Sequence, residues 1–243
     1  MIEREGELPG RRLGRGDPLP FRCHAGLPCF NSCCRDKRLT LLPYDVVRLS
    51  RALGLASGAF LAAHGELEID PASGWPTLRI RLSADGRCPF VRPEGCGVYE
   101  DRPTCCRIYP LARAVGLGAG GAPVEVLVVD ATRDRCGGFD APAAHTVDEW
   151  MRGQGLEAYR GPNERVARLL LDPRRPRPMS LSPEDVHAVV MALYNADVLR
   201  EFVARPGFAA RSGLDEERVA QALRADEDLL ALGQDWLAAR LFG

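Results

Sequence analysis

The chain has 243 residues, of which 46% are hydrophobic and 27% are charged, and its formal net charge is −1. A chain of this length can bury a full core in one or two domains and does not need disulfides to fold. The near-zero charge argues against bulk electrostatic binding to nucleic acid or to an anionic membrane. There is no signal-peptide core and no run near the ~18 apolar residues of a membrane helix. We therefore expect a cytoplasmic protein with neither a membrane nor a nucleic-acid partner.

The first part of the chain changes from a polar tail to helices. Residues 1–20 are rich in Gly, Pro and charge, which predicts a flexible N-terminal tail. A helix is predicted from Pro43, which suits a first turn, to Gly54, which suits a helix end. Ser57 is expected to cap a second, shorter helix that ends at Gly65.

The hydrophobic period then becomes alternating. Apolar residues at 78, 80 and 82 alternate with arginines, which predicts a half-buried strand. Two further apolar runs, 111–115 and 124–129, flank the Gly-rich stretch 116–121 and predict a hairpin with a loose loop. The middle of the chain is therefore expected to be a small sheet interleaved with helices and cysteine loops.

The last third of the chain has a helical pattern. The segment 172–178 reads Asp-Pro-Arg-Arg-Pro-Arg-Pro and cannot be a helix interior, so a solvated linker is predicted there. Ser182-Pro183 then predicts a capped helix start. The fold class is predicted to be α+β, with a cysteine-rich domain at 21–150 and a helical extension at 151–243.

All nine cysteines lie between residues 23 and 136. Thiols used as core filler would not be segregated in this way, whereas thiols that hold a soft metal or an iron–sulfur cluster would be. Such a site usually takes four thiolates, so nine allow two sites with one left over, or one site with bystanders. The spacing is neither that of a common zinc finger nor that of a bacterial ferredoxin, so it does not name the metal.

Adjacent cysteines occur twice, at Cys33-Cys34 and at Cys105-Cys106. Successive side chains tend to point apart, so one member of each pair is expected to bind metal while the other faces elsewhere. A thiolate site of net negative charge would be stabilised by nearby guanidinium groups.

Arg102 and Arg107 flank the second pair and are the preferred candidates for this role. His24 could add a nitrogen ligand, but an ordinary loop histidine is expected because the thiols already suffice.

The runs Cys-Pro-Phe at 88–90, Cys-x-Val-Tyr at 96–99 and Arg-Pro-x2-Cys-Arg-x-Tyr-Pro at 102–110 carry a family resemblance. They resemble the YkgJ-type cysteine-cluster family, a zinc- or iron-chelating domain of CxxCxxCC type, over about residues 21–140. The resemblance implies metal ligation by Cys29, Cys33, Cys34, Cys88, Cys96, Cys106 and Cys136.

This chain departs from the family pattern in its first cluster. The family usually reads Cys-x2-Cys-x2-Cys-Cys there, whereas five residues separate Cys23 from Cys29. Cys23 is therefore a weaker candidate ligand. Cys105 stands where the family motif requires no cysteine, and it is expected to be a bystander.

The expected cofactor is an iron–sulfur cluster, with 4Fe–4S favoured, or Zn²⁺. Iron–sulfur is preferred because many thiols without histidines are unusual for structural zinc.

Members of the family are often labelled iron–sulfur oxidoreductases, and a related domain occurs in flagellin lysine N-methylases. The resemblance thus implies redox or protein-modification chemistry, with a redox partner or a protein substrate. The alternative is a non-enzymatic, zinc-stapled interaction module. Apart from the thiols, no general base or nucleophile stands out, so the residues name no reaction.

Overall fold

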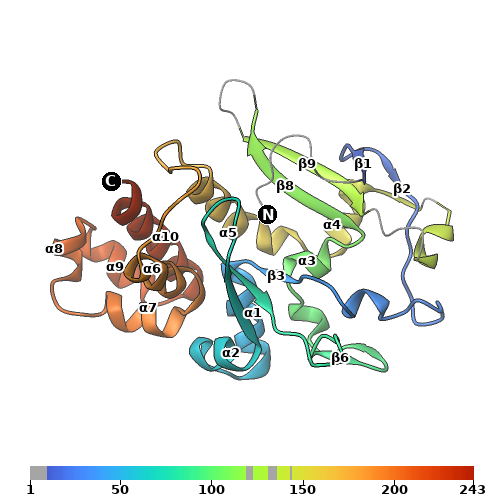
Figure 1. The fold of residues 1–243 in the computed structure, drawn as a ribbon, viewed down its shortest axis with the longest axis horizontal. Helices are drawn as coiled ribbons and strands as arrows, with labels where there is room; N and C mark the ends of the chain where they lie inside the picture. Colours follow the sequence, from blue (N-terminus) through green and yellow to red (C-terminus); the bar gives the residue numbers. More distant parts are fainter. Residues whose placement is uncertain (1–9, 119–122, 131–135, 143) are drawn as a thin grey trace. The chain divides into compact units, whose positions relative to one another are not determined.

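The computed structural model describes residues 10–118, 123–130, 136–142 and 144–243 (Figure 1). The chain forms two compact units, each built from two separate segments. Unit 1 comprises residues 1–37 and 82–160, and unit 2 comprises residues 38–81 and 161–243. This division differs from the predicted boundary at residue 150, because residues 38–81 pack with the C-terminal helices. All nine cysteines belong to unit 1.

Unit 1 contains a three-stranded antiparallel sheet in the order β1–β9–β8. Strands β8 (Leu111–Leu117) and β9 (Pro123–Asp130) form the predicted hairpin, and residues 119–122 of its loop lie outside the described part of the chain. Strand β1 (Gly10–Leu13) pairs along β9. Residues 10–13 of the predicted flexible tail instead form a strand, because β9 supplies backbone partners and Leu13 is buried in the core, and residues 1–9 lie outside the described part of the chain.

The core of unit 1 lies against this sheet and contains Phe21 at its centre. The Phe21 ring centroid lies 5.0 Å from that of Phe139, 5.3 Å from Trp150 and 5.8 Å from Tyr109. Strand β2 (Pro18–Leu19) pairs with β10 (His145–Thr146), which leads into α4 (Val147–Gly153). Because Phe21 precedes Cys23 by two residues, this core fixes where the first cysteine loop begins.

Short elements lie among the cysteines of unit 1. Each has few residues, so its position depends on contacts with its neighbours rather than on its own stability. They are η1 (Ser32–Cys34), β6 (Val91–Arg92), β7 (Gly95–Cys96), η2 (Tyr99–Asp101), α3 (Thr104–Arg107) and η4 (Gly137–Asp140). Three of them, η1, β7 and α3, contain cysteines. Helix α5 (Glu157–Leu170) then runs from unit 1 into unit 2.

Unit 2 combines a small sheet with helices. Strands β3 (Thr40–Leu41), β4 (Gly65–Ile69) and β5 (Pro76–Ile80) form an antiparallel sheet in the order β3–β5–β4. The strand predicted at 78–82 is therefore present but shifted by two residues, since it begins at Pro76 and ends at Ile80. The predicted helices α1 (Pro43–Leu53) and α2 (Ser57–His64) are also present, and Gly54 ends α1 with a left-handed φ of 63°.

The C-terminal segment of unit 2 is helical, as predicted. Ser182 caps α6 by accepting a hydrogen bond from the backbone N–H of Asp185. The helices are α6 (Pro183–Tyr194), α7 (Ala196–Val203), α8 (Phe208–Ser212), α9 (Glu216–Ala222) and α10 (Asp226–Phe242).

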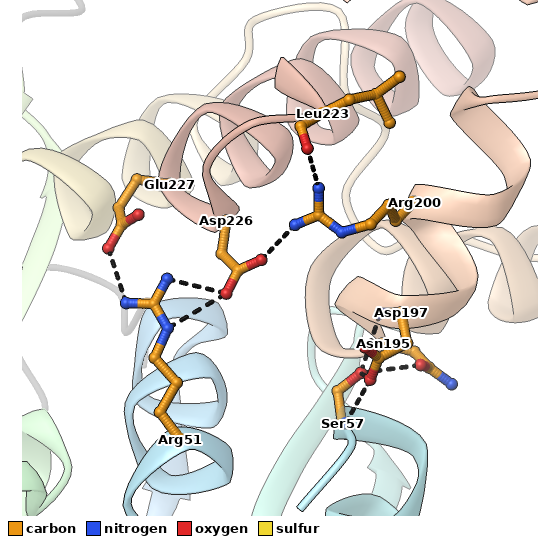
Figure 2. Close-up of polar contacts among 8 residues, drawn as sticks. All are labelled: Arg51, Ser57, Asn195, Asp197, Arg200, Leu223, Asp226 and Glu227. Carbon is orange, nitrogen blue, oxygen red and sulfur yellow. Dashed lines mark hydrogen bonds and ion pairs between the residues drawn. The ribbon is translucent and has the colours of Figure 1, made fainter. Parts of the chain in front are cut away.

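Polar contacts tie these helices to α1 and α2. Figure 2 shows Arg51 of α1 bound to both Asp226 and Glu227 at the start of α10. Ser57 was expected to cap α2, but its hydroxyl instead donates to Asp197, which opens α7 (2.6 Å). The start of α2 is thus joined to the start of α7, which places residues 38–81 with the C-terminal helices.

Most residues of the predicted linker 172–178 are exposed, but Arg175 departs from the expected solvated position. Arg175 is only 6% exposed, and its guanidinium lies 5.2 Å from the ring centroid of Trp75. It donates to the carbonyls of Leu170 (3.2 Å) and Ser73 (3.4 Å), and the backbone N–H of Met179 also bonds Ser73 (2.9 Å). The prolines do exclude helix, but the segment forms a turn, closed by the hydrogen bond from the N–H of Arg175 to the carbonyl of Asp172 (3.0 Å), and Arg175 packs onto the turn before β5.

Among the described helices, none is by itself long and apolar enough to cross a membrane. The bent pair α1 and α2 passes the same test by length and composition alone.

Candidate metal centre

The first cysteine loop is a series of tight turns. The backbone N–H of Ser32 bonds the carbonyl of Cys29 (2.9 Å), and that of Cys34 bonds the carbonyl of Asn31 (3.0 Å). Asn31 has a left-handed φ of 66°, which asparagine tolerates better than most residues. This residue reverses the chain so that Cys33 and Cys34 follow Cys29 closely.

Hydrogen bonds join this loop to the second cysteine segment. The backbone N–H of Cys88 donates to the carbonyl of Cys34 (2.8 Å), and the side-chain amide of Asn31 donates to the carbonyl of Arg92 (2.9 Å). Beside the Cys34–Cys88 hydrogen bond, Arg35 and Arg87 form an antiparallel β-bridge. Two clusters that are far apart in sequence are thus brought together by protein contacts alone.

A tight hairpin formed by β6 and β7 positions Cys88 and Cys96. Cys96 of β7 pairs with Val91 of β6, and the backbone N–H of Val91 bonds the carbonyl of Cys88 (3.2 Å). The short helix α3 then presents Cys105 and Cys106, whose sulfur atoms lie 3.9 Å apart.

Cys136 lies beside the first loop. A Cβ placed on Gly137 would lie 3.9 Å from the Cys29 sulfur, and the carbonyl of Gly138 accepts a hydrogen bond from the N–H of Arg22 (2.9 Å). Gly138 itself has no room for a side chain, because a Cβ there would lie 2.7 Å from the Phe21 ring. This close approach holds Cys136 near Cys23 and Cys29.

The pKa shifts of the thiols show which cysteines lie close enough to affect one another, and they divide most of the cysteines into two groups. Burial raises the pKa of Cys23, and the charges of Cys33, Cys136 and Cys29 raise it further. We refer to Cys23, Cys29 and Cys136 as the first group.

The second group consists of Cys34, Cys88, Cys96 and Cys106. Burial raises the pKa of Cys88 to about 11, with the charges of Cys106 and Cys96 adding to the rise. Burial also raises the pKa of Cys96, again with a contribution from Cys106. These shifts favour the protonated thiols of Cys88 and Cys96, so a bound cation is needed to keep both as thiolates at neutral pH.

Cys33 lies between the two groups. Its hydrogen bond with the Cys34 thiol, together with the charges of Lys37 and Arg102, lowers the pKa of Cys33 to about 7, and the same bond raises the pKa of Cys34. Cys33 therefore ionises more readily than an ordinary thiol, and its charge acts on members of both groups.

The donor set fits a soft metal, since three chain segments contribute thiols and most are at least half-buried. Within the described residues, however, no three Cys, His, Asp or Glu side chains already have an arrangement that could hold an ion.

The two preferred arginines have different roles. Arg107 is buried and donates to the carbonyls of Arg102 (3.0 Å), Gln154 (2.7 Å) and Glu100, with its guanidinium over the Tyr159 ring. It is therefore anchored to the backbone. The guanidinium carbon of Arg102 lies 3.9 Å from the ring centroid of Tyr99. The charge of Arg102 lowers the pKa of Cys33.

His24 and Asn31 both shape the first loop. His24 is exposed, and its Nδ1 accepts a hydrogen bond from the backbone N–H of Gly26 (3.2 Å). The sequence analysis missed Asn31, although an asparagine two residues before a cysteine pair could have suggested a left-handed turn.

One comparison with known proteins gives a match. Residues 22–136 match the model of the CxxCxxCC family, which is described as a putative zinc- or iron-chelating domain. No curated protein and no solved structure matches the chain. The match confirms the resemblance found in the cysteine motifs, and it supports metal binding without selecting the metal.

Proposed function

We propose that this chain, whose residues 22–136 belong to the CxxCxxCC family, binds an iron–sulfur cluster or zinc through its clustered thiolates. The proposed ligands come from the two groups defined above and from the thiol between them. They are Cys23, Cys29, Cys33, Cys34, Cys88, Cys96, Cys106 and Cys136.

The observation that carries this proposal is the convergence of three cysteine segments. A backbone hydrogen bond joins Cys88 to Cys34, and Gly137 lies against Cys29. Scattered structural thiols would have no reason to meet in this way, whereas metal ligation requires it. Eight thiols suit either two four-thiolate sites or one site with additional thiols nearby.

An iron–sulfur cluster, for which the sequence favours 4Fe–4S, would supply one-electron redox chemistry at this place. The protein residues would hold the thiolates and limit water access, since Phe90 is buried beside Cys88. In that form the chain would serve electron transfer or the modification of a protein substrate, in the cytoplasm.

Metal analysis tests the proposal directly. The chain is purified without oxygen, and iron, zinc and acid-labile sulfide are measured on the same sample. A cluster gives visible absorption with iron and sulfide, while zinc gives a colourless protein. A well-folded chain that contains neither metal and takes up neither would contradict the proposal.

A second candidate is a non-enzymatic interaction module stapled by zinc. The position of Arg107 favours it, because this guanidinium is occupied by three backbone carbonyls instead of facing a substrate. Zinc at full occupancy, with no visible absorption and no redox response, would select this candidate over the iron–sulfur form.

A further inference from the structure

Cys105 and Cys106 do not point apart, although they are neighbours in sequence. Their sulfur atoms lie 3.9 Å apart on the short helix α3. Cys105 is half-buried, as is Cys106, so both thiols are within reach of a metal ion. Cys105 is not among the ligands proposed above.

The separation of these sulfurs matches that of two ligands on one tetrahedral ion. Zinc–sulfur bonds of about 2.3 Å that meet at the tetrahedral angle place the two sulfurs about 3.8 Å apart. The observed 3.9 Å therefore requires almost no rearrangement of the pair. In a 4Fe–4S cluster, by contrast, four cysteines bind four different irons, so two thiols would not share one metal.

The backbone that carries the pair is firmly held. Arg107 follows directly and donates to three carbonyls, and the backbone N–H of Cys106 bonds the carbonyl of Pro103 (2.9 Å). The N–H of Ile108 bonds Thr104 (3.0 Å) in the same turn. Because this turn is fixed, the spacing of the two thiols depends only on their side-chain rotamers.

The geometry points to a chelate in which Cys105 and Cys106 bind one tetrahedral ion together, with Zn²⁺ or a single iron as the occupant. The remaining ligands of that ion are drawn from the other thiols of unit 1, which holds all nine cysteines. This inference rests on the proposed metal binding and deepens it. It makes Cys105 a ligand and favours a site of one ion over a 4Fe–4S cluster.

Protection from alkylation tests the chelate on the unaltered chain. The reduced, metal-free protein is treated with iodoacetamide with and without Zn²⁺, and each cysteine is followed by mass spectrometry. We expect Zn²⁺ to slow alkylation of Cys105 and Cys106 alike, by at least about tenfold. Protection of Cys106 with an unchanged rate at Cys105 would overturn the inference while leaving metal binding intact. No uptake of Zn²⁺ or iron by the chain would overturn both.

A variant series adds a spectroscopic readout with Co²⁺ as the probe. Cys105→Ser is expected to lose the thiolate-to-cobalt absorption of one sulfur and to bind Co²⁺ at least about tenfold more weakly. Thr104→Ser is the matched control on the same turn and should behave like the unaltered chain. Equal absorption and affinity in Cys105→Ser and Thr104→Ser would contradict the chelate. If Cys105→Ser does not fold, the protection experiment still decides.

Discussion

The backbone N–H of Cys88 donates a 2.8 Å hydrogen bond to the carbonyl oxygen of Cys34. The bond joins the two cysteine clusters through main-chain atoms, so it does not depend on a metal or on the thiols. The β-bridge between Arg35 and Arg87 extends the same contact. The site is thus partly assembled by the fold, and the metal has only to complete it.

Removal of metal should therefore loosen the cysteine loops without unfolding the chain. We expect hydrogen exchange after chelation to accelerate in residues 22–37 and 88–107 and to change little in the β8–β9 hairpin. The hairpin is held by its own ladder and by a buried core, whereas the loops have few such contacts. Equal acceleration in the loops and in the hairpin would contradict this expectation.

Asn31 should contribute to loop docking through both its backbone and its side chain. Asn31→Ala loses the bond to the Arg92 carbonyl and strains the left-handed backbone, so we expect a loss of about 2 kcal/mol. Asn31→Gly loses only the side-chain bond and should cost about half as much. Denaturant unfolding of the metal-free chain measures both variants. Equal losses would mean that the backbone conformation contributes nothing.

Glu125 of β9 gives the sheet of unit 1 a dependence on pH. Burial would raise the pKa of Glu125, but hydrogen bonds and charge from Arg113 (2.5 Å) and Arg15 (2.7 Å) together lower it below its ordinary 4.5. A carboxyl with a depressed pKa stabilises the folded state above its unfolded pKa. This stabilisation is lost as the pH falls through the folded pKa.

Glu125→Gln should therefore be less stable than the unaltered chain at pH 7 by about 1 kcal/mol, a modest value because the pair is partly exposed. The difference should shrink as the pH is lowered below 4. The exposed Glu94→Gln is the control, and urea unfolding at several pH values is the measurement. A difference that is independent of pH would exclude the ionic contribution.

Local patterns predicted much of this molecule. Pro43, Gly54 and Ser182 marked helix ends correctly, because capping depends on neighbours in sequence. The hairpin and the grouping of the cysteines also followed from local pattern. The assignment of residues 38–81 to unit 2 did not, since it depends on contacts such as Ser57 with Asp197.

The pairing of β1 with β9 and the role of Asn31 were also missed. Both depend on partners about 60 or more residues away in the chain, which periodicity and turn propensity do not describe. The spacing of Cys105 and Cys106 depends in turn on rotamers within α3. A general rule about successive side chains could not supply that distance.

Arg175 shows the same limit and gives a final prediction for unit 2. Its guanidinium is buried against Trp75 and satisfies the carbonyls of Leu170 and Ser73. Arg175→Met keeps much of the apolar stem but removes the donors, so both carbonyls would lose a partner at a cost of about 1–3 kcal/mol.

Arg174 is the natural control, because it is exposed and bonds only its neighbour Asp172 among the described contacts. Arg174→Met should therefore change the free energy of unfolding by less than about 0.5 kcal/mol. Denaturant unfolding followed by circular dichroism, which reports mainly on the helices, measures both variants. If 172–178 were a solvated linker, the two substitutions would have the same small effect, so a clear difference between them identifies this segment as part of the core of unit 2.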